Sequence, residues 1–313
     1  MKHVFGFAIL IVALFAFVLN PALAGENGNA YPNGIEGVNC GVVPPPGIYY
    51  RMYNYFYSAD KLMDADGNEL PVDFDLNVYA MANRLIWVSD AEVLGGNPFF
   101  SLMLPIVHTD IEIGFPAPPP GAGGPPDIDD SDWGIGDIYV DAANIVWNGK
   151  QWQAVGGLGF FAPTGEYDRN EPTSAGKDMW TGMLTLAGTY WPDAERTWSA
   201  SVLARYETHS QQDERDVKYG DDLHFEWGLG KTITRGIDVG VAGYCQWQVT
   251  DDSGDDLTWD PTVHDRVFAA GPELVVTIPP PVLVFISLRT EWEFEAKDRP
   301  EGQTTVLTLT KVF

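Results

Sequence analysis

The sequence predicts an all-β fold, a single antiparallel transmembrane β-barrel of about 12 strands with short periplasmic turns and longer acidic outer loops. Polar and apolar residues alternate along most of the chain, and long and short connections alternate between the strands. Beyond the N-terminus, no apolar run reaches the roughly 18 residues of a membrane helix. The expected strands are 47–59, 72–89, 97–114, 133–147, 151–163, 177–190, 196–208, 219–232, 236–250, 263–277, 282–296 and 302–313.

Residues 1–24 have the pattern of a secretory signal peptide. Lys2 precedes an apolar run over 4–19, and Ala-Leu-Ala at 22–24 supplies a cleavage site. The mature chain is therefore expected to begin at Gly25, with an uncleaved helix as the alternative. Residues 25–46 are rich in Gly, Asn and Pro. They are expected either to lie in the periplasm or to enter the barrel, which residues 47–313 form, as a plug.

Alternation is clearest in the expected strand over 282–296. Val284 and Ile286 share its apolar face, whereas Arg289 and Glu291 share the other face. Most expected strands exceed the roughly five or six residues usual in soluble sheets, and a tilted transmembrane strand needs about 9–11 residues. The lengths therefore favour a membrane barrel over a soluble β-sandwich, which would also alternate.

The connections separate into two classes. Outer-membrane barrels have short turns on the periplasmic side and longer loops outside, so connections of alternating length indicate this architecture. The long, acidic connections are 60–71, 115–132, 164–176, 209–218 and 251–262, and the short ones are 90–96, 148–150, 191–195, 233–235 and 278–281.

The chain ends on an aromatic residue, Phe313, which shares a face of the last strand with Leu307 and Leu309. This ending resembles the signal that the outer-membrane insertion machinery reads. Trp87 and Trp133 are among many aromatic residues near strand ends, as in the aromatic girdles of such barrels. The expected location is the outer membrane of a Gram-negative bacterium, with its lipids, lipopolysaccharide and the insertion machinery as partners.

The composition excludes several classes of function. The chain has 18 Lys and Arg residues and 44 Asp and Glu residues, which gives a net charge of −26. This charge would repel the phosphates of nucleic acids. A hydrophobic fraction of 45% argues against a disordered acidic chain. The two cysteines, Cys40 and Cys245, make no disulfide framework, and whether they pair is left open.

Several Gly- and Pro-rich segments carry a resemblance to a known family. Residues 156–168 read GGLGFFAPTGEYD, in which the Pro-Thr-Gly-x-Tyr-Asp end of a strand resembles the outer-membrane family labelled meta-pathway of phenol degradation. Cys245 stands where an aromatic residue is common in that family. Further similar segments follow in the same order, at 44–49, 94–96 with 104–105, 134–137, 243–254, 271–274 and 298–302.

The resemblance covers nearly all of the mature chain and implies an outer-membrane channel. The expected function is passive uptake of small hydrophobic or aromatic compounds, with a small hydrophobic solute as the partner. The family supplies no defined site residues that could be carried over. Two alternatives remain: a structural or surface-binding barrel with a closed lumen, and a barrel-embedded lipid hydrolase.

Strand alternation also predicts which side chains line the lumen and a solute path. On this register the third strand turns Phe100, Leu102, Leu104 and Ile106 inward, an apolar patch suited to an aromatic solute. A shift of one residue would invert the assignment. The expected inward polar groups are Arg51, Asp73, Asp75, His108, Asp110, Glu112, Asp137, Arg205, Glu207, His224, Glu226, Arg289, Glu291 and Glu293.

No motif indicates catalysis or a bound cofactor. The histidines have no i, i+4 spacing, Gly134-Ile135-Gly136 lacks the third glycine of a dinucleotide fingerprint, and no nucleophile elbow is present. Residues 64–69 contain Asp and Asn, but the glycine position differs from that of an EF-hand loop. We therefore expect no enzyme, no catalytic residues and no cofactor or metal site, with Ca²⁺ or Mg²⁺ at the acidic outer loops as a separate hypothesis.

Overall fold

The computed structural model describes residues 28–118 and 124–313, so the expected signal peptide lies outside the described residues. Within these ranges no helix is long and apolar enough to cross a membrane. A 3-10 turn, η1 (Gly37–Asn39), precedes all the strands. They are β1 (Gly47–Leu62), β2 (Asp73–Val88), β3 (Asn97–Gly114), β4 (Ile128–Ile135), β5 (Ile138–Asn148), β6 (Trp152–Ala162), β7 (Thr181–Tyr190), β8 (Trp198–His209), β9 (Asp222–Thr234), β10 (Ile237–Gln248), β11 (Arg266–Ile278), β12 (Val284–Lys297) and β13 (Pro300–Val312).

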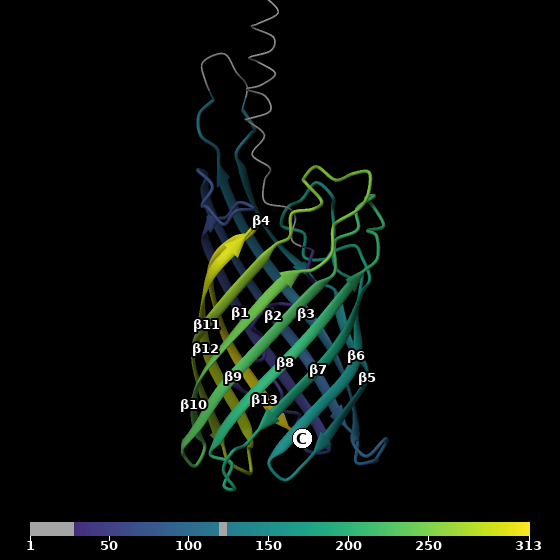
Figure 1. Cartoon of the computed structure of the whole chain (residues 1–313), viewed down its shortest axis with the longest axis vertical. Coiled ribbons are helices and arrows are strands. Elements are labelled where there is room, and N and C mark those ends of the chain that lie inside the picture. Colours follow the sequence, from purple (N-terminus) through teal and green to yellow (C-terminus); the bar gives the residue numbers. More distant parts are fainter. Residues whose placement is uncertain (1–27, 119–123) are drawn as a thin grey trace, which may run out of the picture.

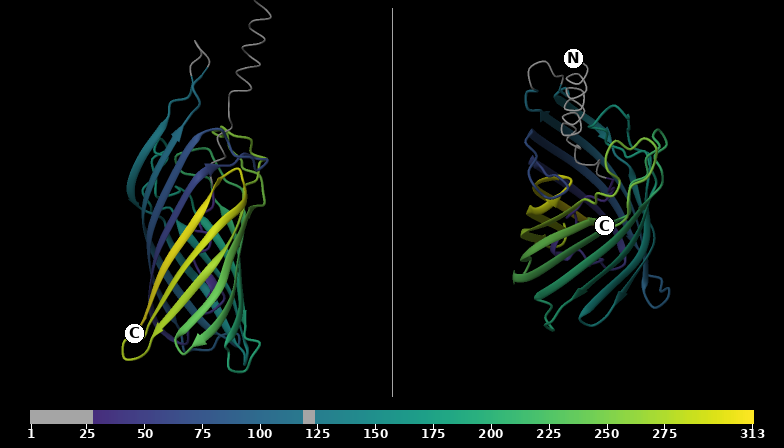
Figure 2. Two further views of the ribbon diagram at one scale, coloured as in Figure 1. Left: turned by 90° about the vertical axis from the view of Figure 1, so that its left-hand side faces the viewer. Right: turned by 45° about the horizontal axis from the view of Figure 1, so that its top comes forward.

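The strands form one closed antiparallel barrel (Figures 1 and 2). Successive strands pair as neighbours, and β1 closes the circle by pairing with β13. β4 and β5 both pair with β3, at its outer and inner halves, and a break at residues 136–137 separates them. They are two halves of one barrel strand, so the barrel has 12 strands and the sequence prediction of the fold is confirmed.

The long connections gather at one end of the barrel, and the short turns gather at the other end with the C-terminus (Figure 1). The hairpin of β3 and β4 projects beyond the barrel rim at the loop end (Figure 2). The long connections are 63–72, 115–127, 163–180, 210–221 and 249–265, and the short ones at the other end are 89–96, 149–151, 191–197, 235–236 and 279–283. The last connection at the loop end, 298–299, is also short.

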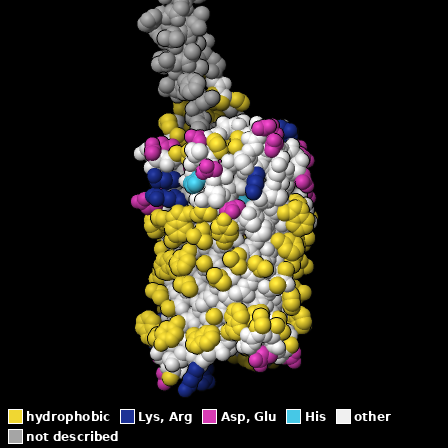
Figure 3. Space-filling view, turned by 45° about the vertical axis from the view of Figure 1, so that its right-hand side comes forward, with side chains coloured by type: hydrophobic (Ala, Val, Ile, Leu, Met, Phe, Trp, Pro, Cys, Tyr) yellow, Lys and Arg dark blue, Asp and Glu magenta, His cyan; other side chains and the backbone are white. Residues whose placement is uncertain are grey.

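A belt of apolar side chains surrounds the outside of the barrel between its more polar ends (Figure 3). Exposed aromatic residues lie toward both ends of this belt, as they do at the two interfaces of a membrane. The barrel therefore sits in an outer membrane, with its long loops outside and its short turns in the periplasm. Trp87, Trp152, Tyr190 and Trp198 lie toward the periplasmic end, and Trp133, Trp180, Tyr206 and Trp292 lie toward the loops.

Candidate functional site in the barrel lumen

Residues 28–46 lie inside the barrel, and we call them the lumen segment. Tyr31 and Ile35 are each only 3% exposed. Gly28 packs against an aromatic side chain of the outer loops, whereas the backbone N–H of Val43 donates to Gln153 near a periplasmic turn (2.7 Å). The segment thus follows the lumen from its outer mouth to its periplasmic end. The described part of this segment lies in the lumen, and a plug role for residues 25–46 stays a prediction.

Buried carboxylates of the barrel wall hold the backbone of the lumen segment. An irregular segment inside a barrel has N–H groups without sheet partners, and buried carboxylates need donors, so each group satisfies the other. Arg289 adds a hydrogen bond to the carbonyl oxygen of Gly34. The N–H donors and their acceptors are Ala30 and Glu207 (3.0 Å), Glu36 and Glu226 (3.1 Å), and Val38 and Glu273 (2.6 Å).

Glu36 is the main ionic anchor of the lumen segment. Its carboxylate lies 2.9 Å from Arg51 and 2.8 Å from Arg84, and the Arg205 guanidinium follows at 4.0 Å. Arg84 also pairs with Asp141 at 2.5 Å, so one network connects the segment to β1, β2, β5 and β8. Arg84, Asp141 and Arg205 are buried, Glu36 is 9% exposed and Arg51 is 21% exposed. A buried charge is stable only when it is paired and hydrogen-bonded.

Apolar side chains form a track along the inside of the wall, centred on β1, β2 and β3. Three buried clusters follow one another from the outer rim to the periplasmic end, and we call them together the apolar track. Between the second and third clusters, the inward side chains are Arg51, Arg84 and Ser101. Most of the charged groups lie on the other side, over β8 to β12. The wall residues of the track are Ala59, Leu62, Phe74 and Ile113, then Tyr53, Ala82, Met103, Tyr139, Phe161, Met183 and Val306, and finally Tyr49, Ile86, Val88, Phe99, Val146 and Val155.

A small cavity of about 60 Å³ lies between the lumen segment and the wall. Its lining combines Phe99, Val155 and Leu203 with the guanidinium groups of Arg84 and Arg205. An apolar cavity of about 150 Å³ is the size known to hold benzene. The cavity therefore has room for a few water molecules and is too small for a benzene ring.

Eight of the side chains that alternation predicted to be inward do lie in the lumen. Glu293 accepts hydrogen bonds from Tyr57 and Tyr244 there, both at 2.8 Å. Asp137 is buried at the break between β4 and β5, where it accepts the backbone N–H groups of residues 164, 165 and 177 and so fixes an outer loop. The eight lumen residues are Arg51, Arg205, Glu207, His224, Glu226, Arg289, Glu291 and Glu293.

The predicted register was inverted on β2 and β3. Ser101 and Met103 are buried inside, whereas Leu102 between them is 50% exposed on the lipid side. The β2–β3 register has no shift, so alternation carries the same inversion along both strands. The outer halves of β2 and β3 carry polar residues on their outward face because they rise beyond the belt. The residues that face outward, contrary to the prediction, are Asp73, Asp75, Phe100, Leu102, Leu104, Ile106, His108, Asp110 and Glu112.

Sequence reasoning missed several lumen residues. Arg84 on β2 was missed because of the inverted register, and the other register would have turned it inward. Glu36 lies in the segment whose placement was left open. His209 and Asp222 stand at the ends of β8 and β9, two residues from the predicted Glu207 and His224 on the same faces, so extending the alternation would have found them.

Two smaller predictions concern the outer loops and the cysteines. In the loop after β1, the Asp64 carboxylate accepts the backbone N–H groups of Asn68 and Asp66, and the Asn68 hydrogen bond lowers the pKa of Asp64. This carboxylate closes a turn. Cys40 is buried in the lumen segment and Cys245 is half-buried on β10, and both are free thiols.

Comparison with known proteins identifies the family. The family model described as MetA-pathway of phenol degradation matches residues 59–309. The chain belongs to this family. No curated protein matches the sequence.

Solved structures of similar shape include an outer-membrane channel from Pseudomonas putida F1, with 15% identity and a TM-score of 0.70 over 91% of this chain and 100% of that one. The translocator domain of the autotransporter NalP from Neisseria meningitidis gives 8% identity and a TM-score of 0.47 over 88% and 91%. The CymD monoaromatic hydrocarbon channel has 10% sequence identity and a TM-score of 0.43, over 94% of this chain and 97% of that one. The first of these shows the barrel fold.

Proposed function

We propose that this family member is an outer-membrane channel for the passive uptake of small hydrophobic or aromatic compounds. The apolar track is the observation that carries the proposal, because its three clusters are spaced along the lumen from the outer rim to the periplasmic end, with Arg51 and Arg84 between the second and the third. A water-filled porin has a polar interior, whereas here Phe, Tyr, Met and branched aliphatic side chains line one side of the lumen. Moving an apolar solute from water to such a wall lowers the free energy by about 25 cal/mol per Å² of apolar area removed from water.

The lumen segment acts as the gate in this proposal. Its Tyr31 and Ile35 cover the middle of the apolar track, so a solute that enters must displace them. The charged network around Glu36 returns the segment to its place after passage, and this keeps the lumen closed to polar solutes. The outer loops would face lipopolysaccharide, with Ca²⁺ or Mg²⁺ between their carboxylates and its phosphates.

The test is uptake of labelled toluene and phenol by cells with and without the gene, at equal outer-membrane integrity. The proposal expects faster initial uptake when the barrel is present. Equal uptake would contradict it and favour a structural barrel with a closed lumen. Release of fatty acid from phospholipid by the purified barrel would instead indicate the lipid hydrolase, and we expect none.

A further inference from the structure

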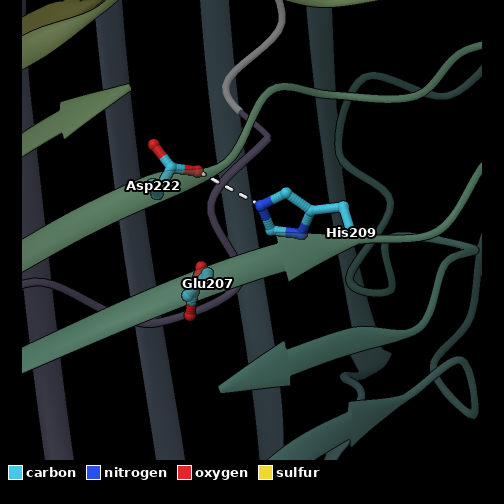
Figure 4. Close-up of side chains that lie close together, drawn as sticks. All are labelled: Glu207, His209 and Asp222. Atoms are coloured by element: carbon cyan, nitrogen blue, oxygen red, sulfur yellow. Dashed lines mark hydrogen bonds and ion pairs between the residues drawn. The ribbon is translucent and has the colours of Figure 1, made fainter. Parts of the chain in front are cut away.

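Three ligand-type side chains meet inside the outer mouth of the barrel, apart from the apolar track. They are Glu207 and His209 on β8 and Asp222 on β9, and Figure 4 shows them on adjacent strands. One ligand atom from each lies within 4.8 Å of the others. The side chains are at most 4% exposed, and His209 Nε2 lies 3.2 Å from Asp222 Oδ2. The cluster is thus a compact buried set of one imidazole and two carboxylates.

The surrounding residues hold the other polar atom of each side chain. Thr181 bonds His209 Nδ1 (2.9 Å), and Gln246 donates to Asp222 Oδ1 (2.8 Å). The backbone N–H of Ala30 donates to Glu207 Oε2. When the N–H of His209 is at Nδ1, toward the threonine hydroxyl, Nε2 presents a lone pair. Such outer hydrogen bonds are what orient the ligands in protein metal sites.

Glu207 supplies an independent indication that a ligand is missing. Its Oε1 is buried and has no hydrogen-bond partner among the described residues, whereas its other oxygen, Oε2, accepts from Ala30 and lies 3.5 Å from His224 Nε2. Glu207 and Asp222 are also directly opposite each other in the β8–β9 register, where like charges destabilise a sheet. Leaving a buried carboxylate oxygen unpaired is costly, and a cation between the two carboxylates would remove both costs.

We propose that Glu207, His209 and Asp222 bind one divalent transition-metal ion of the Zn²⁺ class. Imidazole nitrogen and carboxylate oxygen are ligands for Zn²⁺ and Co²⁺, whereas Ca²⁺ and Mg²⁺ select oxygen alone. Zn–N and Zn–O bonds of about 2.0–2.2 Å require the ligand atoms to approach one another by roughly 1 Å, within the range of side-chain rotation. A water molecule would complete the coordination.

The proposed ion would also fix the lumen segment. Glu207 holds the N–H of Ala30, so a bound metal orients the carboxylate to which the outer end of the segment is attached. The site does not depend on the proposed function, since its ligands lie outside the apolar track. No sequence motif marks this cluster, because strand pairing, and not an i, i+4 spacing, brings His209 to Asp222.

The experiment uses the full mature barrel, refolded in detergent and treated with chelator. Co²⁺ is added and its visible absorption is followed, and Zn²⁺ is then added to displace it. We expect one equivalent of Co²⁺ bound, with the absorption of a site of low coordination number. His209→Ala and Asp222→Asn should each weaken binding at least tenfold.

The matched control is His264→Ala, which removes a half-exposed outer-loop histidine paired with Asp251 at 2.8 Å. It should leave binding unchanged. Folding of every variant is checked by heat-modifiable gel mobility, and if His209→Ala does not fold, Asp222→Asn decides alone. Absence of Co²⁺ binding by the folded wild type would overturn the proposal, as would binding that Asp222→Asn retains or that His264→Ala abolishes.

Discussion

Glu36 is the carboxylate that forms ion pairs with three arginines of the barrel wall. The guanidinium groups of Arg51 and Arg84 contact it directly, and Arg205 approaches it while lying 4.1 Å from the ring of Tyr31. Cations of this kind are stable in a buried site only while their counter-charge stays in place. Glu36 therefore determines whether the lumen segment remains in the barrel.

Glu36→Gln should lower the free energy of unfolding by about 3 kcal/mol, because it leaves buried guanidinium groups without their anion. Urea unfolding in phospholipid vesicles measures the change. The control is Glu295→Gln, which removes an exposed partner of Arg266 at 3.1 Å and should cost less than about 1 kcal/mol. Equal effects of the two substitutions would contradict the anchoring role of Glu36.

At this scale, alternation predicted much of the charged side of the lumen. Arg289 and Glu291 were placed correctly because β12 has an apolar face that only lipid or a core could cover. The carboxylate of Glu36 could not be predicted to meet three arginines, since this depends on the path of a segment without periodicity. The contact between His209 and Asp222 depends on strand register, which no local pattern gives.

At the scale of elements, the number of barrel strands and most of the alternation of long and short connections followed from the sequence. The expected strand over 133–147 instead begins at residue 128 and is broken at 136–137, and the connection 298–299 at the loop end is short. The orientation of β3 did not follow from the sequence, because one of its faces has Phe100, Leu102 and Leu104 while the other has Met103 and Ser101. Both lipid and the apolar track accept such residues, so hydrophobicity alone does not select a face.

The lumen segment passes close to Gly228 of β9. A Cβ added at Gly228 would lie 2.4 Å from Val38 Cα, so the close approach requires glycine there.

Leu104→Arg tests the orientation of β3. Leu104 faces lipid within the belt, so arginine there should destabilise the barrel by about 2–4 kcal/mol in vesicles. Leu94→Arg, in the periplasmic turn after β2, makes the same chemical change outside the membrane at a residue that is 83% exposed, and should have little effect. If Leu104→Arg left the free energy of unfolding unchanged, the lipid-facing orientation would be wrong.

At the scale of the whole molecule, the barrel divides its interior between two kinds of wall. The side over β8 to β12 holds the lumen segment through carboxylates and Arg289. Most of the apolar track lies on the opposite side, where Arg51 and Arg84 bind Glu36 between two of its clusters. The outer surface carries an apolar belt, which suits contact with the hydrocarbon part of the membrane (Figure 3). In the function proposed above, an apolar solute uses the track and the polar anchors hold the lumen segment as a gate.

The measurement that tests this account most directly is the initial uptake rate of labelled toluene at equal barrel abundance, in cells with wild type, Phe99→Asn, Thr185→Asn or no barrel. Phe99 and Thr185 both line the cavity beside the lumen segment, but only Phe99 belongs to the apolar track. The account predicts that an amide in place of Phe99 reduces barrel-dependent uptake by roughly tenfold, because it makes the track polar, while Thr185→Asn stays within about twofold of wild type. Equal uptake with and without the barrel, or equal uptake by the two variants, would contradict it.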